Sequence, residues 1–124
     1  MLTRSLNILV IDDEPGIRKL IELILEDHEI VTAGSVDEAT ELLNSRTYDL
    51  VISDVKMPGK SGFELLEEIH RINPNTPVIL MTGHAEEDEL IHPCLDKSAG
   101  FLAKPFEDED LIGMIDGIFS SSDS

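Results

Sequence analysis

The chain has 124 residues, with 26 acidic and 9 basic side chains and a formal net charge of -17. This length fits one domain with a proper core, and the acidic balance argues against direct nucleic-acid binding. The single Cys94 excludes an internal disulfide, and the sequence contains neither a membrane-spanning apolar run nor a signal peptide. These features predict a cytoplasmic protein with no membrane partner.

The first predicted strand is the apolar run 6–11, which leads into the acids Asp12, Asp13 and Glu14. Clustered carboxylates suit a hard divalent cation such as Mg²⁺, although a run of like charges can also be a solvated loop. A proline after these acids favours a helix start, and apolar residues at helical spacing predict a helix over 15–27. We expect its buried face to contain Ile17, Leu20, Ile21, Ile24 and Leu25.

The middle of the chain repeats this pattern of strand and helix. Strands are predicted at 29–33 and 49–53, and each is followed by a capping box, at Ser35 and at Ser61. The expected buried faces of the two helices are Val36, Ala39, Leu42 and Leu43, and then Phe63, Leu66, Ile69 and Ile72. Asp54 directly follows a buried strand, at the edge where open α/β sheets bind ligands. A simple turn-capping role for Asp54 is the alternative interpretation.

The last third of the chain contains two more strands, predicted at 77–81 and 100–103, which run into Thr82 and Lys104. A final helix is predicted over 107–119, with Leu111, Ile112, Ile115, Ile118 and Phe119 turned inward. Residues 120–124 are polar and low in complexity, which is typical of a disordered tail or the start of a linker.

The segment 85–97 between these strands has helical character but contains Pro93. A proline inside a helix removes one hydrogen bond and clashes with the preceding turn, at a cost of ~3 kcal/mol. We therefore expect this fourth helix to stop near Ile91 and to leave an irregular segment that a partner could contact.

Five strand–helix units predict an α/β domain in which right-handed crossovers join parallel strands and helices cover both faces of the sheet. Parallel strands end at the same edge, so Asp12, Asp13, Asp54, Thr82 and Lys104 should meet there. Carboxylates can hold a divalent cation, and one of them can act as nucleophile toward a phosphoryl group. A lysine can neutralise the phosphoryl charge, and a threonine hydroxyl can bond to a phosphoryl oxygen.

The motifs at these strand ends resemble the receiver domain of two-component response regulators. The resemblance is carried by Asp12-Asp13, by Asp54 with Met57-Pro58-Gly59 and Gly62, by Thr82, and by Lys104-Pro105-Phe106. It covers residues 6–119 and implies a flavodoxin-like, doubly wound three-layer sandwich with strand order 2-1-3-4-5. The domain would then comprise residues 1–119.

The resemblance also implies a role for each matching residue. Asp54 would be the phosphoacceptor that becomes an aspartyl phosphate, and Lys104, in a cis peptide bond with Pro105, would pair with the phosphoryl group. Thr82 and Phe101 would form the pair that moves on phosphorylation. The ligands of Mg²⁺ (or Mn²⁺) would be Asp12, Asp13, Asp54 and the backbone carbonyl of Lys56. Lys56 and His84 stand at positions expected to tune the lifetime of the phosphoryl group.

The implied partner is a sensor histidine kinase or a phosphotransfer protein that donates its phosphoryl group from a phosphohistidine. Catalysis would be limited to the domain's own phosphorylation and dephosphorylation, so it would not be an enzyme toward other substrates. The fourth helix, fifth strand and fifth helix would form the surface that switches, contacts partners and allows a homodimer.

Two other functions fit an acidic site on such a sheet less well. An aspartyl-phosphate phosphatase or phosphotransferase would need a second carboxylate two residues after Asp54 as general acid, and a cap domain. A flavin-binding module would need a Gly/Ser/Thr-rich phosphate loop after the first strand, where this chain has acids. The other histidines lack metal-ligand spacing and are expected to be surface residues: His28, His70 and His92.

Overall fold

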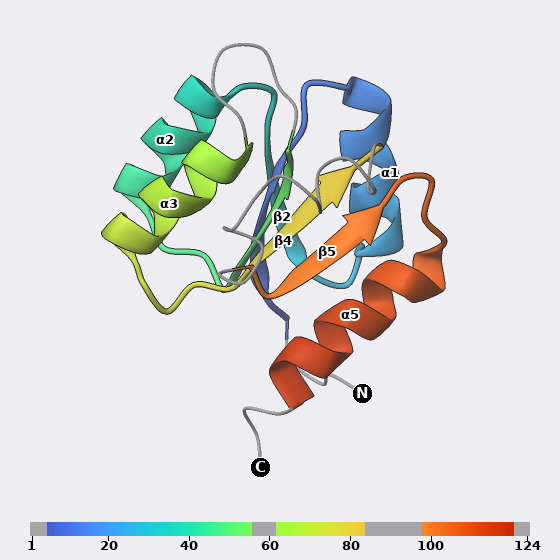
Figure 1. The fold of residues 1–124 in the computed structure, drawn as a ribbon. Coiled ribbons are helices and arrows are strands. Elements are labelled where there is room, and N and C mark those ends of the chain that lie inside the picture. Colours follow the sequence, from blue (N-terminus) through green and yellow to red (C-terminus); the bar gives the residue numbers. More distant parts are fainter. Residues whose placement is uncertain (1–4, 56–61, 84–97, 121–124) are drawn as a thin grey trace.

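A computed structural model describes residues 5–55, 62–83 and 98–120 of the chain (Figure 1). Its core is a five-stranded parallel sheet of order β2-β1-β3-β4-β5, so the predicted fold class and strand order are confirmed. The strands are β1 Asn7–Ile11, β2 Glu29–Ala33, β3 Leu50–Asp54, β4 Val78–Thr82 and β5 Gly100–Ala103. The helices are α1 Pro15–Ile24, α2 Val36–Ser45, α3 Gly62–Ile72 and α5 Asp108–Ser120.

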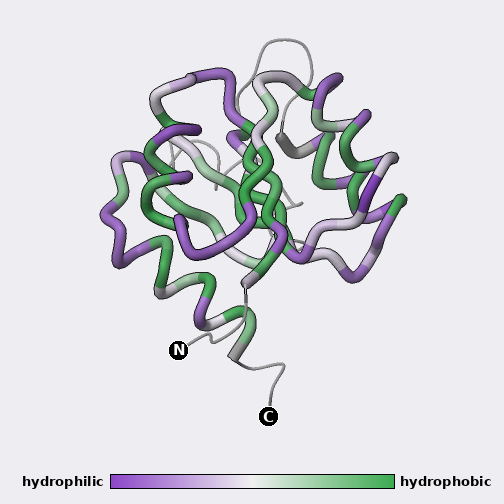
Figure 2. Tube along the Cα trace, turned by 180° about the vertical axis from the view of Figure 1, so that it is seen from behind, coloured by the Kyte–Doolittle hydropathy of each residue, from purple (hydrophilic) through white to green (hydrophobic). Residues whose placement is uncertain are grey.

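The sheet lies between two layers of helices, with α2 and α3 on one face and α1 and α5 on the other (Figure 1). Because strand side chains alternate between the faces, β1 contributes Leu9 and Ile11 to one core and Ile8 and Val10 to the other. The central strands are hydrophobic along most of their length (Figure 2). Because the strands are buried on both faces, their sequences are nearly continuous apolar runs.

The strand registers place the functional edge. Ile11 of β1 pairs with Ser53 of β3, and Asp54 pairs with Met81 of β4. Thr82 in turn pairs with Ala103 of β5. The residues at or directly after these strand ends therefore lie along one edge of the sheet, as the sequence predicts.

Helix α2 shows how a local signal sets an element boundary. The Ser35 hydroxyl accepts a hydrogen bond from the Glu38 N–H at 3.1 Å, which is the predicted cap. The Glu38 carboxylate, however, accepts from the N–H of Gly34 at 2.7 Å, one residue before the expected partner. The other capping box begins at Ser61, outside the described residues, and α3 starts at Gly62.

The predicted end of α1 and the predicted burial of two helical residues are wrong. Helix α1 ends at Ile24 instead of residue 27, because Leu25 already has a non-helical backbone. Leu20 and Ile112 are 39% and 41% exposed, although both were expected to be buried. Leu20 precedes the fully buried Ile21 and Ile112 follows the fully buried Leu111, so each lies at the margin of the buried stripe of its helix.

Two further differences concern α3 and α5. Ile72 is 37% exposed at the end of α3, whereas Leu65, which the predicted face omits, is fully buried. Helix α5 extends to Ser120, one residue beyond the expected end of this helix. The predicted interruption at Pro93 lies outside the described residues. No helix within the described ranges is both long enough and apolar enough to cross a membrane.

Candidate functional site

Four carboxylates gather where β1 and β3 end. Asp12 follows β1 and is fully buried, while Asp54 is the last residue of β3 and is 6% exposed. Asp13 and Glu14 are exposed on the same turn. One oxygen from each of these four side chains lies within 4.8 Å of the others. The sheet thus brings together the acids that the sequence predicts at this edge.

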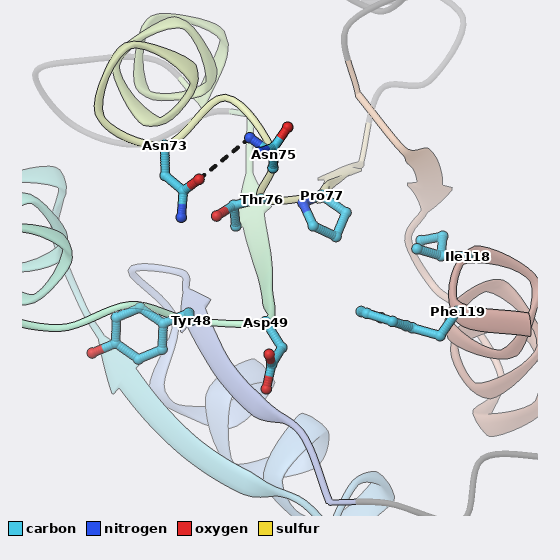
Figure 3. Close-up of a pocket in the computed structure, with 8 residues that line it drawn as sticks. All are labelled: Tyr48, Asp49, Asn73, Asn75, Thr76, Pro77, Ile118 and Phe119. Atoms are coloured by element: carbon cyan, nitrogen blue, oxygen red, sulfur yellow. Dashed lines mark hydrogen bonds between the residues drawn. The ribbon is translucent and has the colours of Figure 1, made fainter. Parts of the chain in front are cut away.

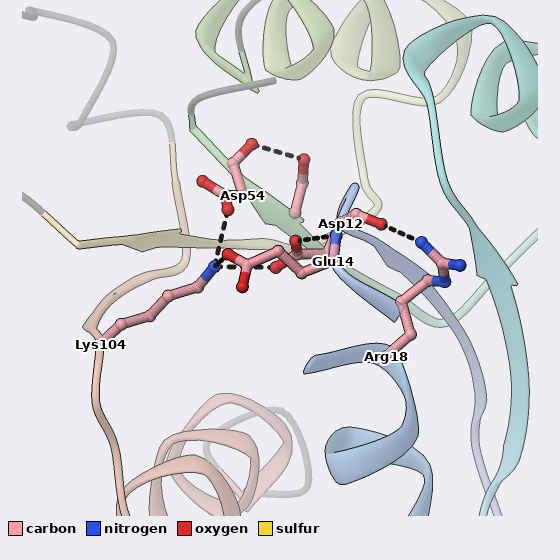
Figure 4. Close-up of polar contacts among 6 residues, drawn as sticks. Asp12, Glu14, Arg18, Asp54 and Lys104 are labelled. Carbon is pink, nitrogen blue, oxygen red and sulfur yellow. Dashed lines mark hydrogen bonds and ion pairs between the residues drawn. The ribbon is translucent and has the colours of Figure 1, made fainter. Parts of the chain in front are cut away.

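Lys104 connects the two buried acids. Its Nζ lies 2.9 Å from Asp12 Oδ2 and 2.7 Å from Asp54 Oδ2, so it donates a hydrogen bond to each (Figure 4). The same nitrogen lies 3.7 Å from Glu14 Oε1. The Lys104–Pro105 peptide bond is cis, the isomer that the resemblance implies. Charge-assisted hydrogen bonds of this kind are stronger than neutral ones.

The environment of Lys104 keeps it protonated. Burial by itself lowers the pKa of the ammonium, but the hydrogen bonds to Asp54 and Asp12, and the charges of both acids, more than offset burial. The net pKa of Lys104 is therefore raised above its ordinary value. At neutral pH the site contains a cation held between two carboxylates.

Two further residues contact the site: Glu14, from the acidic run that predicts a cation site, and Arg18, which was not assigned to it from the sequence. Glu14 belongs to the acidic run and contributes a fourth converging carboxylate. Arg18 lies one helical turn later and donates from Nη1 to the backbone oxygen of Asp12 at 2.6 Å (Figure 4). No local signal in the sequence predicted the Arg18 contact, because its acceptor is a backbone oxygen and not an opposite charge.

Of the other predicted site residues, the structure describes Thr82 and Phe101. Thr82 is fully buried at the end of β4, and its backbone oxygen accepts a 2.7 Å hydrogen bond from the Lys104 N–H. Phe101 is half-buried in β5 beside Leu80 and packs against the core on the α2–α3 face. Lys56 and His84 lie outside the described residues.

The donor set fits a hard divalent cation. Mg²⁺ binds carboxylate and carbonyl oxygens and is usually held by one or two protein carboxylates together with other oxygen ligands. Asp12, Asp13, Glu14 and Asp54 supply such oxygens within reach of a single ion. This edge of the sheet can therefore bind a divalent metal next to the carboxylate of Asp54.

A separate hollow of about 450 Å³ lies at the opposite edge, where β3 and β4 begin (Figure 3). It is lined by the residues before these strands and by the end of α5, including Tyr48, Asp49, Asn73 and Phe119. The Tyr48 hydroxyl is buried and has no hydrogen-bond partner among the described residues. Burial raises the pKa of Tyr48, and the charge of Arg46 beside its ring lowers it by less. No group of converging acids is found there among the described residues.

One histidine expected at the surface has a structural role. His28 is half-buried, and its Nδ1 accepts a 3.0 Å hydrogen bond from the backbone N–H of Leu6. His70 is partly buried in the last turn of α3, and His92 lies outside the described residues.

Comparison with known proteins points to one family. A family model described as the response regulator receiver domain matches residues 8–116. The chain is 35% identical over 124 residues to the transcriptional regulatory protein GlrR of Escherichia coli, covering 98% of this chain and 28% of that protein. It is 32% identical to the DNA-binding transcriptional regulator NtrC of Escherichia coli, covering 90% of this chain and 24% of that protein. The chain thus spans about a quarter of the length of these relatives.

Solved structures agree with this match. The response regulator protein TrrA from Thermotoga maritima, in complex with Mg²⁺-BeF, superimposes with a TM-score of 0.83 at 33% identity, over 91% of this chain and 98% of that chain. A CheY-like response regulator receiver domain protein from Methanospirillum hungatei gives a TM-score of 0.87 at 27% identity, over 97% of this chain and 98% of that chain.

Proposed function

The chain belongs to the response regulator receiver domain family of two-component signalling, and from this premise we propose that Asp54 is its phosphoacceptor. Response regulators receive phosphoryl groups from histidine kinases, so the proposed donor is a phosphohistidine on a sensor histidine kinase or a phosphotransfer protein. The observation that carries the proposal is the contact of 2.7 Å between Lys104 Nζ and Asp54 Oδ2 within the acidic cluster.

In the proposed reaction, a carboxylate oxygen of Asp54 attacks the phosphorus atom of the phosphohistidine. The new P–O bond forms as the P–N bond breaks, and the electron pair of that bond stays on the imidazole nitrogen, which takes up a proton. Lys104 offsets the charge of the phosphoryl oxygens, since its ammonium already lies beside Asp54. Thr82 would donate its hydroxyl to a phosphoryl oxygen.

The proposed ligands of the cation are Asp12, Asp13, Asp54 and the backbone carbonyl of Lys56, and Glu14 lies close enough to contribute. A bound Mg²⁺ would neutralise charge on the phosphoryl oxygens. Mn²⁺ could replace it, because it also prefers oxygen ligands. The similar TrrA protein was solved in complex with Mg²⁺-BeF, which supports a divalent metal at this type of site.

Signalling would then proceed through Thr82 and Phe101 to a partner surface formed by β5, α5 and the segment 85–97. The same surface would also allow contact between two copies of the chain. The domain would modify only itself. An aspartyl-phosphate phosphatase is not favoured, because the relatives and structures named above are regulators.

The proposal is tested by incubating the protein with acetyl phosphate and Mg²⁺ and measuring its intact mass. The wild type should gain one phosphoryl group, and Asp54→Asn should gain none. Asp37→Asn is the matched control, because Asp37 is an exposed acid in the first turn of α2. An adduct that persists in Asp54→Asn would overturn the assignment.

A further inference from the structure

Each of the four polar atoms of Asp12 takes part in a hydrogen bond. Its N–H donates to Ala33 O at 3.1 Å, and its Oδ1 accepts from the Glu14 N–H at 2.9 Å. Its Oδ2 accepts from Lys104, and its backbone oxygen accepts from Arg18 at 2.6 Å. The last of these contacts comes from a side chain that plays no part in the proposed phosphoryl chemistry.

The path of the Arg18 side chain depends on a glycine. Ile11 of β1 pairs with Ala33 of β2, so Asp12 lies beside Gly34 at the end of the edge strand. A Cβ atom on Gly34 would lie 3.1 Å from Arg18 Nη1, which is closer than such atoms normally approach. The missing side chain at residue 34 therefore leaves room for the guanidinium to reach the backbone of Asp12.

We propose that Arg18 is a positioning residue for the divalent-cation site, an inference that rests on the proposed function. The carbonyl that Arg18 binds belongs to the peptide plane joining Asp12 to Asp13. Fixing this plane restricts ψ of Asp12 and φ of Asp13, and so fixes the directions in which both carboxylates leave the chain.

A purely structural role for Arg18, as a link between α1 and the end of β1, makes a different prediction. Loss of such a link would lower the free energy of unfolding and leave the affinity for metal unchanged. A positioning role instead predicts a change in Mg²⁺ affinity of the folded protein. Substitution of residues that orient metal ligands typically weakens metal binding by about 10- to 100-fold.

The test is a calorimetric titration of the full chain with Mg²⁺. Arg18→Met keeps the apolar stem and removes the donor, and we expect it to raise the Kd by about tenfold or more. Lys19→Met is the matched control, because Lys19 is an exposed cation on the same helix, and its Kd should remain that of the wild type. Arg18→Lys should recover part of the affinity, since an ammonium can also donate to the carbonyl.

If Arg18→Met does not fold, Gly34→Ala and its control Gly113→Ala provide the test of the positioning role. Gly34→Ala should raise the Kd in the same direction by crowding the guanidinium, whereas Gly113→Ala should not, because a Cβ there meets no atom within 4 Å. If Arg18→Met folds and has the Kd of the wild type, the inference about Arg18 is wrong, while the proposed function still stands. If Arg18→Met does not fold, a wild-type Kd in Gly34→Ala has the same meaning. Absence of Mg²⁺ binding and of phosphorylation in the wild type would overturn the proposed function, and this inference with it.

Discussion

The two ends of the sheet bury polar groups in opposite ways. Where the strands end, the charged Asp12 and Asp54 are buried but paired with Lys104. Where the strands begin, the neutral hydroxyl of Tyr48 is buried with no partner among the described residues. An unpaired buried charge costs far more than an unpaired hydroxyl, so only the hydroxyl can be left alone. Charge at the functional edge is therefore tolerated because it is paired, and a bound cation can share in that pairing.

Among changes to the charged and polar groups compared above, removing the ammonium of Lys104 should have the largest effect. Lys104→Met leaves Asp12 and Asp54 buried without a counter-charge, and we expect the free energy of unfolding to fall by about 3 kcal/mol in metal-free buffer. Urea denaturation with and without Mg²⁺ measures this. Mg²⁺ should stabilise the variant more than the wild type, because it offsets the same two charges. Lys19→Met should change little, and an equal loss in both variants would contradict the comparison.

Removing an exposed acid from the cluster should have a smaller effect of the opposite sign. Asp13→Ala relieves repulsion among the four carboxylates, and we expect metal-free stability to rise by up to about 1 kcal/mol. The stabilisation by Mg²⁺ that we expect in the wild type should be absent from this variant. Thermal unfolding across a range of Mg²⁺ concentrations measures both effects, with Asp37→Ala as the control. Equal stabilisation of both variants by Mg²⁺ would show that Asp13 is not a ligand.

At the opposite edge, removing the unpaired hydroxyl should cost almost nothing. Tyr48→Phe keeps the ring and deletes a buried oxygen that has no partner among the described residues, so we expect a change within about 1 kcal/mol, toward higher stability. Tyr48→Ala should instead destabilise by about 3 kcal/mol or more, because it empties the packed site. Urea denaturation of the two variants separates hydroxyl from ring. A large loss in Tyr48→Phe would mean that the hydroxyl is bonded in solution.

The smallest effect concerns alkaline pH. The pKa values of Lys104 and Tyr48 are both raised in the folded protein, so the folded state retains these protons when the unfolded chain loses them. Their contribution to stability is complete below the ordinary values of about 10 and is lost as the pH rises through the folded values. Unfolding free energies measured from neutral pH upward should therefore decline above pH ~10. The decline should be shallower in Tyr48→Phe, and an unchanged slope would remove Tyr48 from this explanation.

The strand–helix repeats and the residues at the strand ends could be predicted from local signals in the sequence. Hydrophobic periodicity, prolines and the cap at Ser35 are local signals, and they predicted nearly every described element within one residue, apart from the end of α1. The convergence of Asp12, Asp54 and Lys104 also followed from the sequence, because parallel strands end at one edge. The strand order came from the family resemblance, since spacing alone does not specify which strands are neighbours.

Which atoms of the site contact one another depends on tertiary packing and could not be predicted from the sequence. Lys104 bridges two acids because β5, β4, β3 and β1 lie side by side in the sheet. Arg18 reaches the backbone of Asp12 past Gly34 because α1 and β2 pack beside β1. The exposure of Leu20 and Ile112 was decided in the same way. An apolar stripe shows which side of a helix turns inward, but the width of the buried strip depends on the surface against which the helix packs.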